Sequence, residues 1–232
     1  MTRVLIAAPV KQDRKTFTLY QDSLHALRCP EGVTFDTFFV VNDCPGLIPL
    51  IKGEYEECNT GDFYQKTLET HIWTERNLGK MPLLRNKTIK RALDGGYDYL
   101  FSVDSDLVLH PDTLSILLDA KKDIVAELFW TQTWPNAWMY DQCDCANSKW
   151  AEPGLYEVGM TGACILISRK VLEAGVDYSP IPNIRYLYGE DRFFCIRAAC
   201  HGFEIWGDSH CPPYHLYTQK ELNAYLRQRG AD

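Results

Sequence analysis

YLFSVDSD, at residues 99–106, joins an apolar run of strand length to two aspartates. A short apolar run bounded by polar residues is typical of a buried strand. In an extended chain, residues two apart point to the same side, so Asp104 and Asp106 can converge on one cation. Open α/β sheets bind ligands at this carboxyl edge, and oxygen ligands favour Mg²⁺ or Mn²⁺ over zinc. The alternative is that Asp104-Ser105-Asp106 is a solvated turn.

The segments on either side of this run alternate between strand-like and helix-like patterns, which indicates the α/β class. Residues 130–153 show no regular period, so we expect a long loop there. The expected strands are Val4–Ala8, Thr34–Val41, Tyr97–Val103, Asp123–Phe129, Cys164–Ser168 and Phe203–Trp206. The expected helices are Thr16–Leu27, Leu83–Leu93, Pro111–Ala120, Arg169–Ala174, Glu190–Cys200 and Gln219–Arg229.

Composition narrows the possible classes of protein. The 232 residues are 46% apolar and show neither an internal repeat nor a clear linker, so we expect one continuous domain. A net charge of −7 gives no general attraction for nucleic acid or anionic lipid, although it leaves a local basic groove open. No apolar run approaches the ~18 residues of a membrane span. Nine scattered cysteines do not resemble a secreted disulfide framework, so we expect a reduced, cytoplasmic protein.

Two further groups of residues carry possible chemistry. Glu190 and Asp191 open an expected helix, where acidic side chains interact favourably with the helix dipole. The functional interpretation makes Asp191 or Glu190 a general base at the edge of a cleft. His210 and His215 follow the last expected strand, and either could bind a metal ion.

In their order along the chain, Asp104-Ser105-Asp106, Gly189-Glu190-Asp191 and the late histidine resemble the GT-A glycosyltransferases, especially their family-two branch. Other short motifs agree in order, and the resemblance extends over residues 3–216. These motifs are Ala7-Ala8-Pro9-Val10 at the first strand, Asn42-Asp43 after the second strand, Leu84-Arg85-Asn86-Lys87 before the Asp-Ser-Asp strand, and Gly159-Met160-Thr161-Gly162-Ala163.

The resemblance implies a Rossmann-like GT-A fold with a mixed, mostly parallel sheet. Residues 1–110 would form the nucleotide-sugar half, residues 111–217 the acceptor half, and residues 218–232 a C-terminal helix. It implies a metal-dependent transferase that moves one sugar from a nucleoside-diphosphate sugar, most often a UDP-sugar, to an acceptor hydroxyl. The donor would be contacted by Ala8, Pro9, Val10, Asp43, Arg85, Asn86, Asp104, Ser105, Asp106 and Gly162.

The resemblance also assigns roles at the reacting centre. Asp104, Asp106 and His215 would hold Mn²⁺ or Mg²⁺, with His210 as the rival third ligand. Asp191 would be the base of an inverting enzyme, which we prefer to a retaining enzyme in which Asp191 and Glu190 position substrates. Glu190 would also contact the acceptor.

The expected loop is rich in aromatic residues, with Trp130, Trp134, Trp138, Tyr140 and Trp150. Flat rings suit sugar faces, so we expect Trp134 and Trp138 to form a mobile acceptor lid; the alternative is a satellite hydrophobic cluster. Two cysteines of the same loop, at positions 143 and 145, could bind zinc. We expect no such site, because no second Cys/His pair is placed to complete it.

Two other functions remain open. A sugar-nucleotide nucleotidyltransferase would need a glycine-rich basic loop near the first strand, but residues 7–15 offer Lys11, Arg14 and Lys15 without glycine. A carbohydrate- or nucleotide-binding protein without turnover would keep the same acids. The absence of the Gln-x-x-Arg-Trp pattern disfavours a processive synthase. The acceptor (glycan, lipid, protein or modified base), the oligomeric state and the role of residues 47–75 are not predicted.

Overall fold

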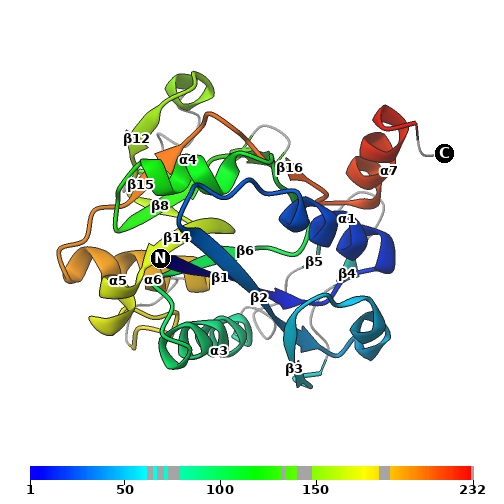
Figure 1. The fold of residues 1–232 in the computed structure, drawn as a ribbon, viewed down its shortest axis with the longest axis horizontal. Helices are drawn as coiled ribbons and strands as arrows, with labels where there is room; N and C mark the ends of the chain where they lie inside the picture. Colours follow the sequence, from blue (N-terminus) through cyan, green and yellow to red (C-terminus); the bar gives the residue numbers. More distant parts are fainter. Residues whose placement is uncertain are drawn as a thin grey trace.

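A computed structural model describes residues 1–61, 65–66, 71–72, 79–131, 134–139, 148–182 and 189–230. An eight-stranded sheet with the strand order β12-β15-β8-β14-β6-β1-β2-β3 forms its centre (Figure 1). Its strands are β1 (Thr2–Val10), β2 (Val33–Asn42), β3 (Glu54–Cys58), β6 (Tyr99–Val103), β8 (Ile124–Glu127), β12 (Leu155–Glu157), β14 (Cys164–Ser168) and β15 (Trp206–Asp208). Strands β14 and β12 run antiparallel to their neighbours, and the other neighbouring pairs are parallel. The predicted α/β class with a mixed, mostly parallel sheet is confirmed.

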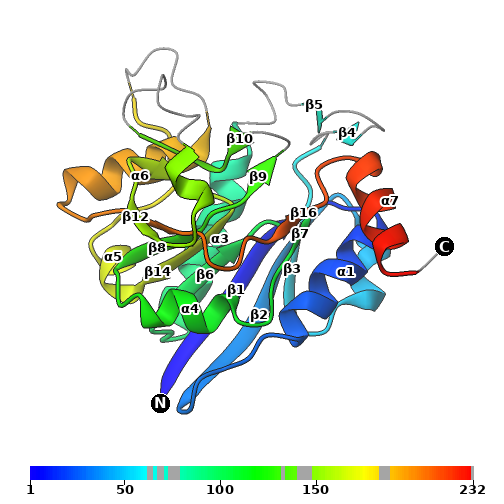
Figure 2. The same ribbon diagram turned by 90° about the horizontal axis from the view of Figure 1, so that it is seen from above.

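Helices cover both faces of this sheet, as the turned view shows (Figure 2). Val4 and Ile6 of β1 pack in the same core as α1 (Arg14–His25) and α4 (Thr113–Asp119). Leu5 and Ala7 pack in the opposite core with α3 (Met81–Asp94), α5 (Arg169–Glu173) and α6 (Glu190–Cys200). Strand β1 is apolar at successive positions because its side chains alternate between two faces of the sheet that are both covered by helices.

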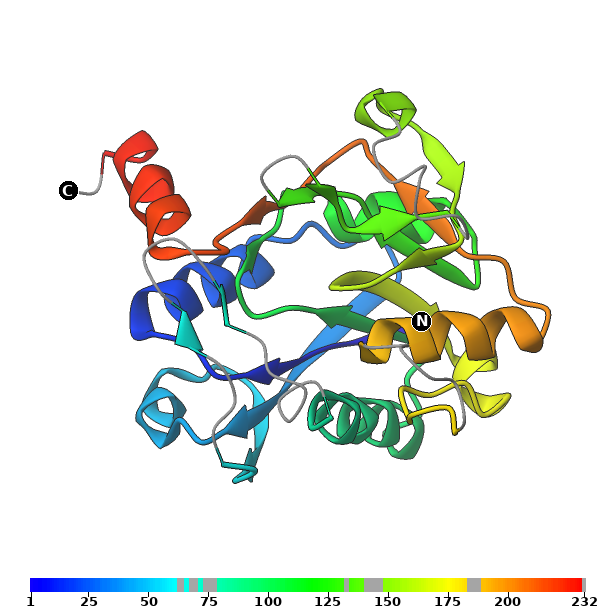
Figure 3. The ribbon, with the colours of Figure 1, turned by 180° about the vertical axis from the view of Figure 1, so that it is seen from behind.

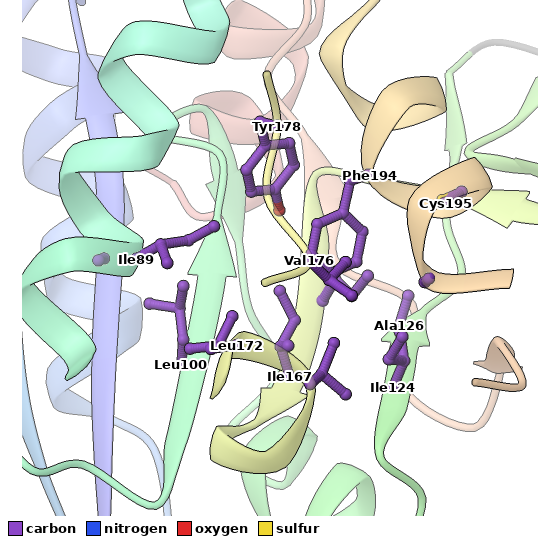
Figure 4. Close-up of a cluster of buried hydrophobic side chains, with 14 of the residues drawn as sticks. Ile89, Leu100, Ile124, Ala126, Ile167, Leu172, Val176, Tyr178, Phe194 and Cys195 are labelled. Atoms are coloured by element: carbon purple, nitrogen blue, oxygen red, sulfur yellow. The ribbon is translucent and has the colours of Figure 1, made fainter. Parts of the chain in front are cut away.

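The core fixes the start of α6. The ring of Phe194 stacks on that of Tyr178, with centroids 4.8 Å apart and an interplanar angle of 24°. Figure 4 shows both rings above Val176 and Ile167. Because Phe194 is about one turn beyond Asp191, this buried contact anchors the end of the helix that carries Glu190 and Asp191.

A separate two-stranded pairing brings a late segment of the chain back beside the turn that follows β6. Strand β16 (Tyr214–His215) pairs antiparallel with β7 (Leu107–Val108), and His215 lies opposite Leu107. Helix α7 (Gln219–Gln228) follows, and Thr218 and Glu221 close a capping box at its start. The view from behind shows α7 beside α1 (Figure 3). The register places His215 next to the residue that follows Asp106.

The expected loop at residues 130–153 was wrong in part, because described portions of it are ordered into short elements. They are β9 (Trp130–Thr131), β10 (Trp134–Pro135), β11 (Ala137–Trp138) and the 3₁₀ helix Ser148–Ala151; β11 pairs with β13 (Met160–Thr161). Strands of two residues are too short to show a period in the sequence. Further short elements are the 3₁₀ helix Pro45–Leu50, β4 (Gln65–Lys66) and β5 (His71–Ile72).

The last strand of the main sheet was predicted at Phe203–Trp206 but lies at Trp206–Asp208. Gly207, a poor strand former in isolation, occupies its middle. A side chain there is not tolerated, because a Cβ on Gly207 would lie 2.6 Å from a methyl carbon of Leu128. Close packing therefore overrides the local preference. Among the described residues, no helix has the length and apolar character needed to cross a membrane.

Candidate active site

Arg85 is the centre of a buried polar network at the carboxyl edge of the sheet. Its side chain is 2% exposed. Its Nε donates to Oε1 of Glu190 at 2.8 Å, its Nη2 to Oδ1 of Asp104 at 2.8 Å, and its Nη1 to Oγ of Ser102 at 3.2 Å. One guanidinium therefore ties α3, β6 and α6 together through charge-assisted hydrogen bonds.

Asp191 lies beside this network and keeps partial access to solvent. Its Oδ1 is 3.9 Å from Nε of Arg85, and the side chain is 28% exposed. Burial raises the pKa of Asp191 to about 8, and the negative charges of Glu190 and Asp104 act in the same direction, whereas Arg85 opposes them. A carboxyl group with a pKa in this range can take up a proton near neutral pH, as a general base must.

Gly162 leaves the space that the Asp191 carboxylate occupies. A Cβ on Gly162 would lie 2.1 Å from Oδ2 and 2.2 Å from Cγ of Asp191. Those distances are far below van der Waals contact, so any side chain at position 162 must displace the carboxylate.

Gly162→Ala is therefore expected to lower the turnover number about 100-fold while the protein stays folded, because a displacement of about 1 Å at a reacting group has an effect of that size. The matched control is Gly46→Ala, since no atom lies within 4 Å of a Cβ built on Gly46. Steady-state kinetics together with circular dichroism check the prediction. Unchanged turnover in Gly162→Ala would show that the position of Asp191 does not matter.

The Asp104-Ser105-Asp106 segment is a turn, which corrects the extended geometry expected from the sequence. The backbone N–H of Asp104 donates to the carbonyl of Ala163 at 2.7 Å, and that of Leu107 donates back to the carbonyl of Asp104 at 3.1 Å. Burial raises the pKa of Asp104, as do the charges of Asp106 and Glu190, while Arg85 opposes the rise. The two aspartates are therefore neighbours although they do not lie on one strand.

His215 and His210 have different surroundings. Nε2 of His215 lies 3.6 Å from Oδ1 of Asp106, and its Nδ1 lies 2.8 Å from Oγ1 of Thr131. Nδ1 of His210 instead lies 3.0 Å from both carboxylate oxygens of Asp208. The structure thus brings His215 to the Asp-Ser-Asp turn and binds His210 to a different carboxylate.

The donor set partly fits the expected divalent cation. Asp106 and His215 offer an oxygen and a nitrogen 3.6 Å apart, and one oxygen of Asp104 is already bound to Arg85. Three carboxylates, those of Asp104, Glu190 and Asp191, face one buried guanidinium, so the cluster carries excess negative charge when it is ionised. In the described part of the chain, however, no three His, Cys, Asp or Glu side chains form a ready-made metal site. A cation here would need further oxygen ligands from a bound substrate.

The predicted donor edge shows two unsatisfied polar groups. Within the described residues, Oδ2 of Asp43 and Nδ2 of Asn42 are buried without a hydrogen-bond partner. Asp43 also has a φ of 52°, in the left-handed region. A backbone in the left-handed region costs stability. A buried polar group without a partner also costs stability, unless a ligand or a water molecule forms a hydrogen bond with it.

The other residues predicted to bind the donor are turned toward the protein. Ala8, Pro9 and Val10 are buried at the end of β1, so only their backbone can face a ligand. The amide of Asn86 binds Ser179 Oγ at 2.9 Å and accepts the backbone N–H of Tyr178 at 2.9 Å. Contacts of Asn86 and Arg85 with a donor stay predictions, and the hydrogen bonds seen here position other parts of the site.

The aromatic residues of the expected lid are distributed over several environments. Trp134 is 62% exposed on β10, whereas Trp138 is half-buried with the Arg192 guanidinium carbon 5.5 Å from its ring centroid. Trp150 is 3% exposed and belongs to the core, and half-buried Trp130 packs against the same core. Acceptor contacts by Trp134 and Trp138 stay predictions. Tyr140 and the two cysteines at positions 143 and 145 lie outside the described residues.

Sequence reasoning missed Asn136, which ties the aromatic segment to the site. Its Nδ2 donates to the carbonyls of Gly162 at 3.0 Å and Glu127 at 3.2 Å, and its Oδ1 accepts the N–H of Phe129 at 3.0 Å. An asparagine between Pro135 and Ala137 gives no signal of this role, because its three partners are backbone groups 7, 9 and 26 residues away.

A second acidic pair, also missed, lies at the carboxyl ends of β8 and β15. Glu127 and Asp208 are register partners on parallel strands and are 0% and 3% exposed. Oε1 of Glu127 accepts the N–H of Cys211 at 2.8 Å, while Oε2 has no hydrogen-bond partner in the described part of the chain. Burial, with the charge of Asp208 in support, raises the pKa of Glu127 to about 8.

Glu127→Gln is expected to change the pH dependence of stability. The folded state holds the Glu127 proton up to about pH 8, whereas the unfolded state releases it near the ordinary pKa of 4.5. Wild-type stability from this group therefore falls as pH rises between those values. The variant has no such proton, so relative to the wild type it should gain more than about 1 kcal/mol of unfolding free energy between pH 5 and pH 8. Urea titrations check this, with exposed Glu31→Gln as control; a constant difference between Glu127→Gln and wild type would contradict it.

Several solved structures share the fold, including the three that follow. A197 from STIV gives a TM-score of 0.52 at 17% identity, over 93% of this chain and 86% of A197. S. aureus TarS 1–349 in complex with UDP-GlcNAc gives 0.53 at 13% identity, over 92% of this chain and 57% of that one. CMP:2-keto-3-deoxy-manno-octonic acid synthetase complexed with CTP gives 0.56 at 9% identity, over 99% of both chains.

The chain therefore has the α/β fold of GT-A and nucleotidyltransferase structures, and at these identities the likeness shows the fold alone. It spans little more than half of the TarS fragment. No protein-family model matches the sequence, and comparison with curated proteins finds no match.

Proposed function

We propose that the chain is a glycosyltransferase that moves one sugar from a nucleoside-diphosphate sugar, with UDP as the favoured nucleotide, to the hydroxyl of a discrete acceptor. The observation that carries the proposal is the partly exposed Asp191 carboxyl beside Gly162, with its raised pKa, at the same sheet edge as Asp104 and Asp106. A TarS structure with this fold contains UDP-GlcNAc, which supports a nucleotide sugar as the donor.

In this proposal Asp191 is the base of an inverting transfer. It accepts the proton of the acceptor hydroxyl while the hydroxyl oxygen forms a bond to the anomeric carbon of the donor. The bond between that carbon and the diphosphate oxygen breaks, and the electron pair leaves with the nucleoside diphosphate. Arg85, which is hydrogen-bonded to Glu190, attracts the base through the ion pair at 3.9 Å between its Nε and Oδ1 of Asp191.

The nucleotide would lie along the ends of β1 and β2. The buried Oδ2 of Asp43 can accept a hydrogen bond from an N–H of the base, which would satisfy an atom that the described protein leaves unpaired. Mg²⁺ or Mn²⁺, held by Asp106 and His215 beside Asp104, would neutralise negative charge on the leaving diphosphate.

A nucleotidyltransferase uses the same fold, and a synthetase solved with CTP matches this chain along its whole length. That reaction has to stabilise a triphosphate near the first strand. The segment after β1, Lys11–Asp13, contains no glycine. The side chain of its Asp13 accepts the N–H of Thr16 at 3.0 Å and so caps α1. We therefore favour sugar transfer.

The experiment is to incubate the protein with UDP-, GDP-, ADP- and dTDP-sugars, Mn²⁺ or Mg²⁺, and a panel of glycan, lipid and peptide acceptors. Release of a nucleoside diphosphate that depends on the acceptor, with a glycosylated product seen by mass spectrometry, is expected. A parallel arm supplies CTP or UTP with free sugars or sugar phosphates. Pyrophosphate release in that arm, without sugar transfer in the first, would contradict the proposal.

A further inference from the structure

A basic hollow lies at the end of the sheet opposite the carboxylates. It has a volume of about 450 Å³. The turn before β8 and the start of β15 form one side of it, and the start of α5 forms another. Strands β8 and β15 run in the same direction as β6, so the residues before them are at the edge away from Asp104. Figures 1 and 3 both show the segment from α6 to β15 passing beside α5 at this end. Its principal side chains are those of Lys121, Lys122, Lys170, His201, Phe203 and Trp206.

Aromatic rings and a carboxylate hold two of the ammonium groups in place. Nζ of Lys122 lies 3.6 Å from the ring centroid of Trp206. Nζ of Lys170 lies 5.3 Å from that of Phe203 and 2.7 Å from a carboxylate oxygen of Asp123. Cation–π contacts restrain lysine side chains that would otherwise move freely in solvent. The hollow therefore presents cations whose positions are partly fixed.

The charges of this hollow do not cancel. Three lysines face two carboxylates, those of Asp123 and Glu204, and the Glu204 carboxylate accepts the indole N–H of Trp206 at 3.1 Å. In the part of the chain that the structure describes, Lys121 and Lys122 form no ion pair. The excess is positive on a chain whose net charge is −7. This hollow therefore attracts anions, although the net charge of the whole molecule repels them.

Lys121 occupies a backbone position that favours glycine. Its φ is 51°, and its N–H donates to the carbonyl of Leu118 at 3.1 Å, directly after the C-cap of α4 at Ala120. Glycine is the usual residue at this place after a helix, because a side chain there is strained in the left-handed region. A lysine at this position thus lowers the stability of the fold relative to glycine, which indicates that its ammonium group has a use.

We propose that this hollow binds the phosphate group of a small organic phosphate, of the size of a sugar phosphate. Ammonium groups supply several hydrogen-bond donors and charge to phosphate oxygens. The volume is larger than one phosphate ion needs and falls in the range of small-molecule sites. The rings of Phe203 and Trp206 add apolar walls for the organic part. No residue of the proposed transfer reaction takes part.

Calorimetric titration of the whole protein with glucose 6-phosphate, inorganic phosphate and glucose tests this site. Saturable binding of glucose 6-phosphate, tighter than inorganic phosphate and with no binding of glucose, is expected. Binding by the variants Lys121→Gly and Lys122→Gln should weaken about tenfold each, whereas Lys90→Gln on α3 should bind as the wild type does. UDP binding at the carboxylate edge should be the same in all of them, which separates this site from the proposed function.

Lys121→Gly also shows whether weaker binding of glucose 6-phosphate could result from misfolding of the variant. Glycine relieves the left-handed strain, so this variant should unfold at a higher temperature than the wild type while it binds glucose 6-phosphate more weakly. Failure of the wild type to bind glucose 6-phosphate would overturn the proposal. So would equal affinity for inorganic phosphate, or variants at positions 121 and 122 that bind as tightly as the wild type.

Discussion

Asp191→Asn is expected to lower the rate of sugar transfer by about 10²–10⁴-fold, the range that general-base catalysis contributes. Asparagine keeps the shape of the side chain next to Gly162 but cannot accept the proton of the acceptor hydroxyl. Binding of the nucleotide should change little, since the base does not hold the donor. Single-turnover kinetics measure the chemical step directly, and exposed Asp119→Asn on α4 serves as a matched control.

The pH profile adds a second test of the same role. The base must be ionised, so kcat/KM should rise as pH rises through the pKa of Asp191, which burial raises above the ordinary range of a carboxyl group. Asp191→Asn should lack this rise. A wild-type profile that is flat from pH 5 to pH 9, with full turnover in the variant, would mean that another group takes the proton.

Arg85→Met is expected to lower the free energy of unfolding by about 3–5 kcal/mol, the size found when one partner of a buried ion pair is removed. Asp104 and Glu190 would lose the guanidinium that binds both of them at 2.8 Å, and methionine supplies only comparable bulk. The loss should be largest at high pH, where the carboxylates are ionised, and smaller at low pH, where protonation removes their repulsion. Denaturant titrations at pH 5 and pH 8 measure both values.

A double variant distinguishes lost charge balance from lost packing. Arg85→Met combined with Glu190→Gln removes one buried negative charge together with the cation, so it should recover part of the stability that Arg85→Met loses. Additive losses in the two single variants would show that Arg85 stabilises the core by its bulk alone, which would contradict the network described here.

Local patterns in the sequence predicted most strands of the central sheet and most of the helices that cover it. The run before Asp104 predicted β6, and the acidic start at Glu190 predicted α6, because burial on two faces and helix-end electrostatics each leave a local signal. Strand β3 at Glu54–Cys58 left no such signal. It is an edge strand whose residues are mostly exposed, so nothing in its composition requires it to pair.

The arrangement of the candidate site depends on contacts between distant segments. That Arg85 would be buried among carboxylates could not be read from its helix, because its partners lie on β6 and α6. The position of His215 follows from its pairing with Leu107, and that of Asp191 from the missing side chain at Gly162. The order of the motifs along the chain was enough to predict which residues belong to the candidate site. Their arrangement in space could be seen only in the folded structure.

The most direct test of the central claim is calorimetric titration of the protein with UDP, GDP, CDP, ADP and dTDP, with and without Mn²⁺ or Mg²⁺, using wild type, Asp106→Asn and Asp43→Asn. We predict that one nucleotide binds, that binding requires the cation, and that both variants weaken it. If the folded wild type binds none of these nucleotides, or if Asp106→Asn binds as tightly as the wild type, the carboxylate edge is not a nucleotide-sugar site.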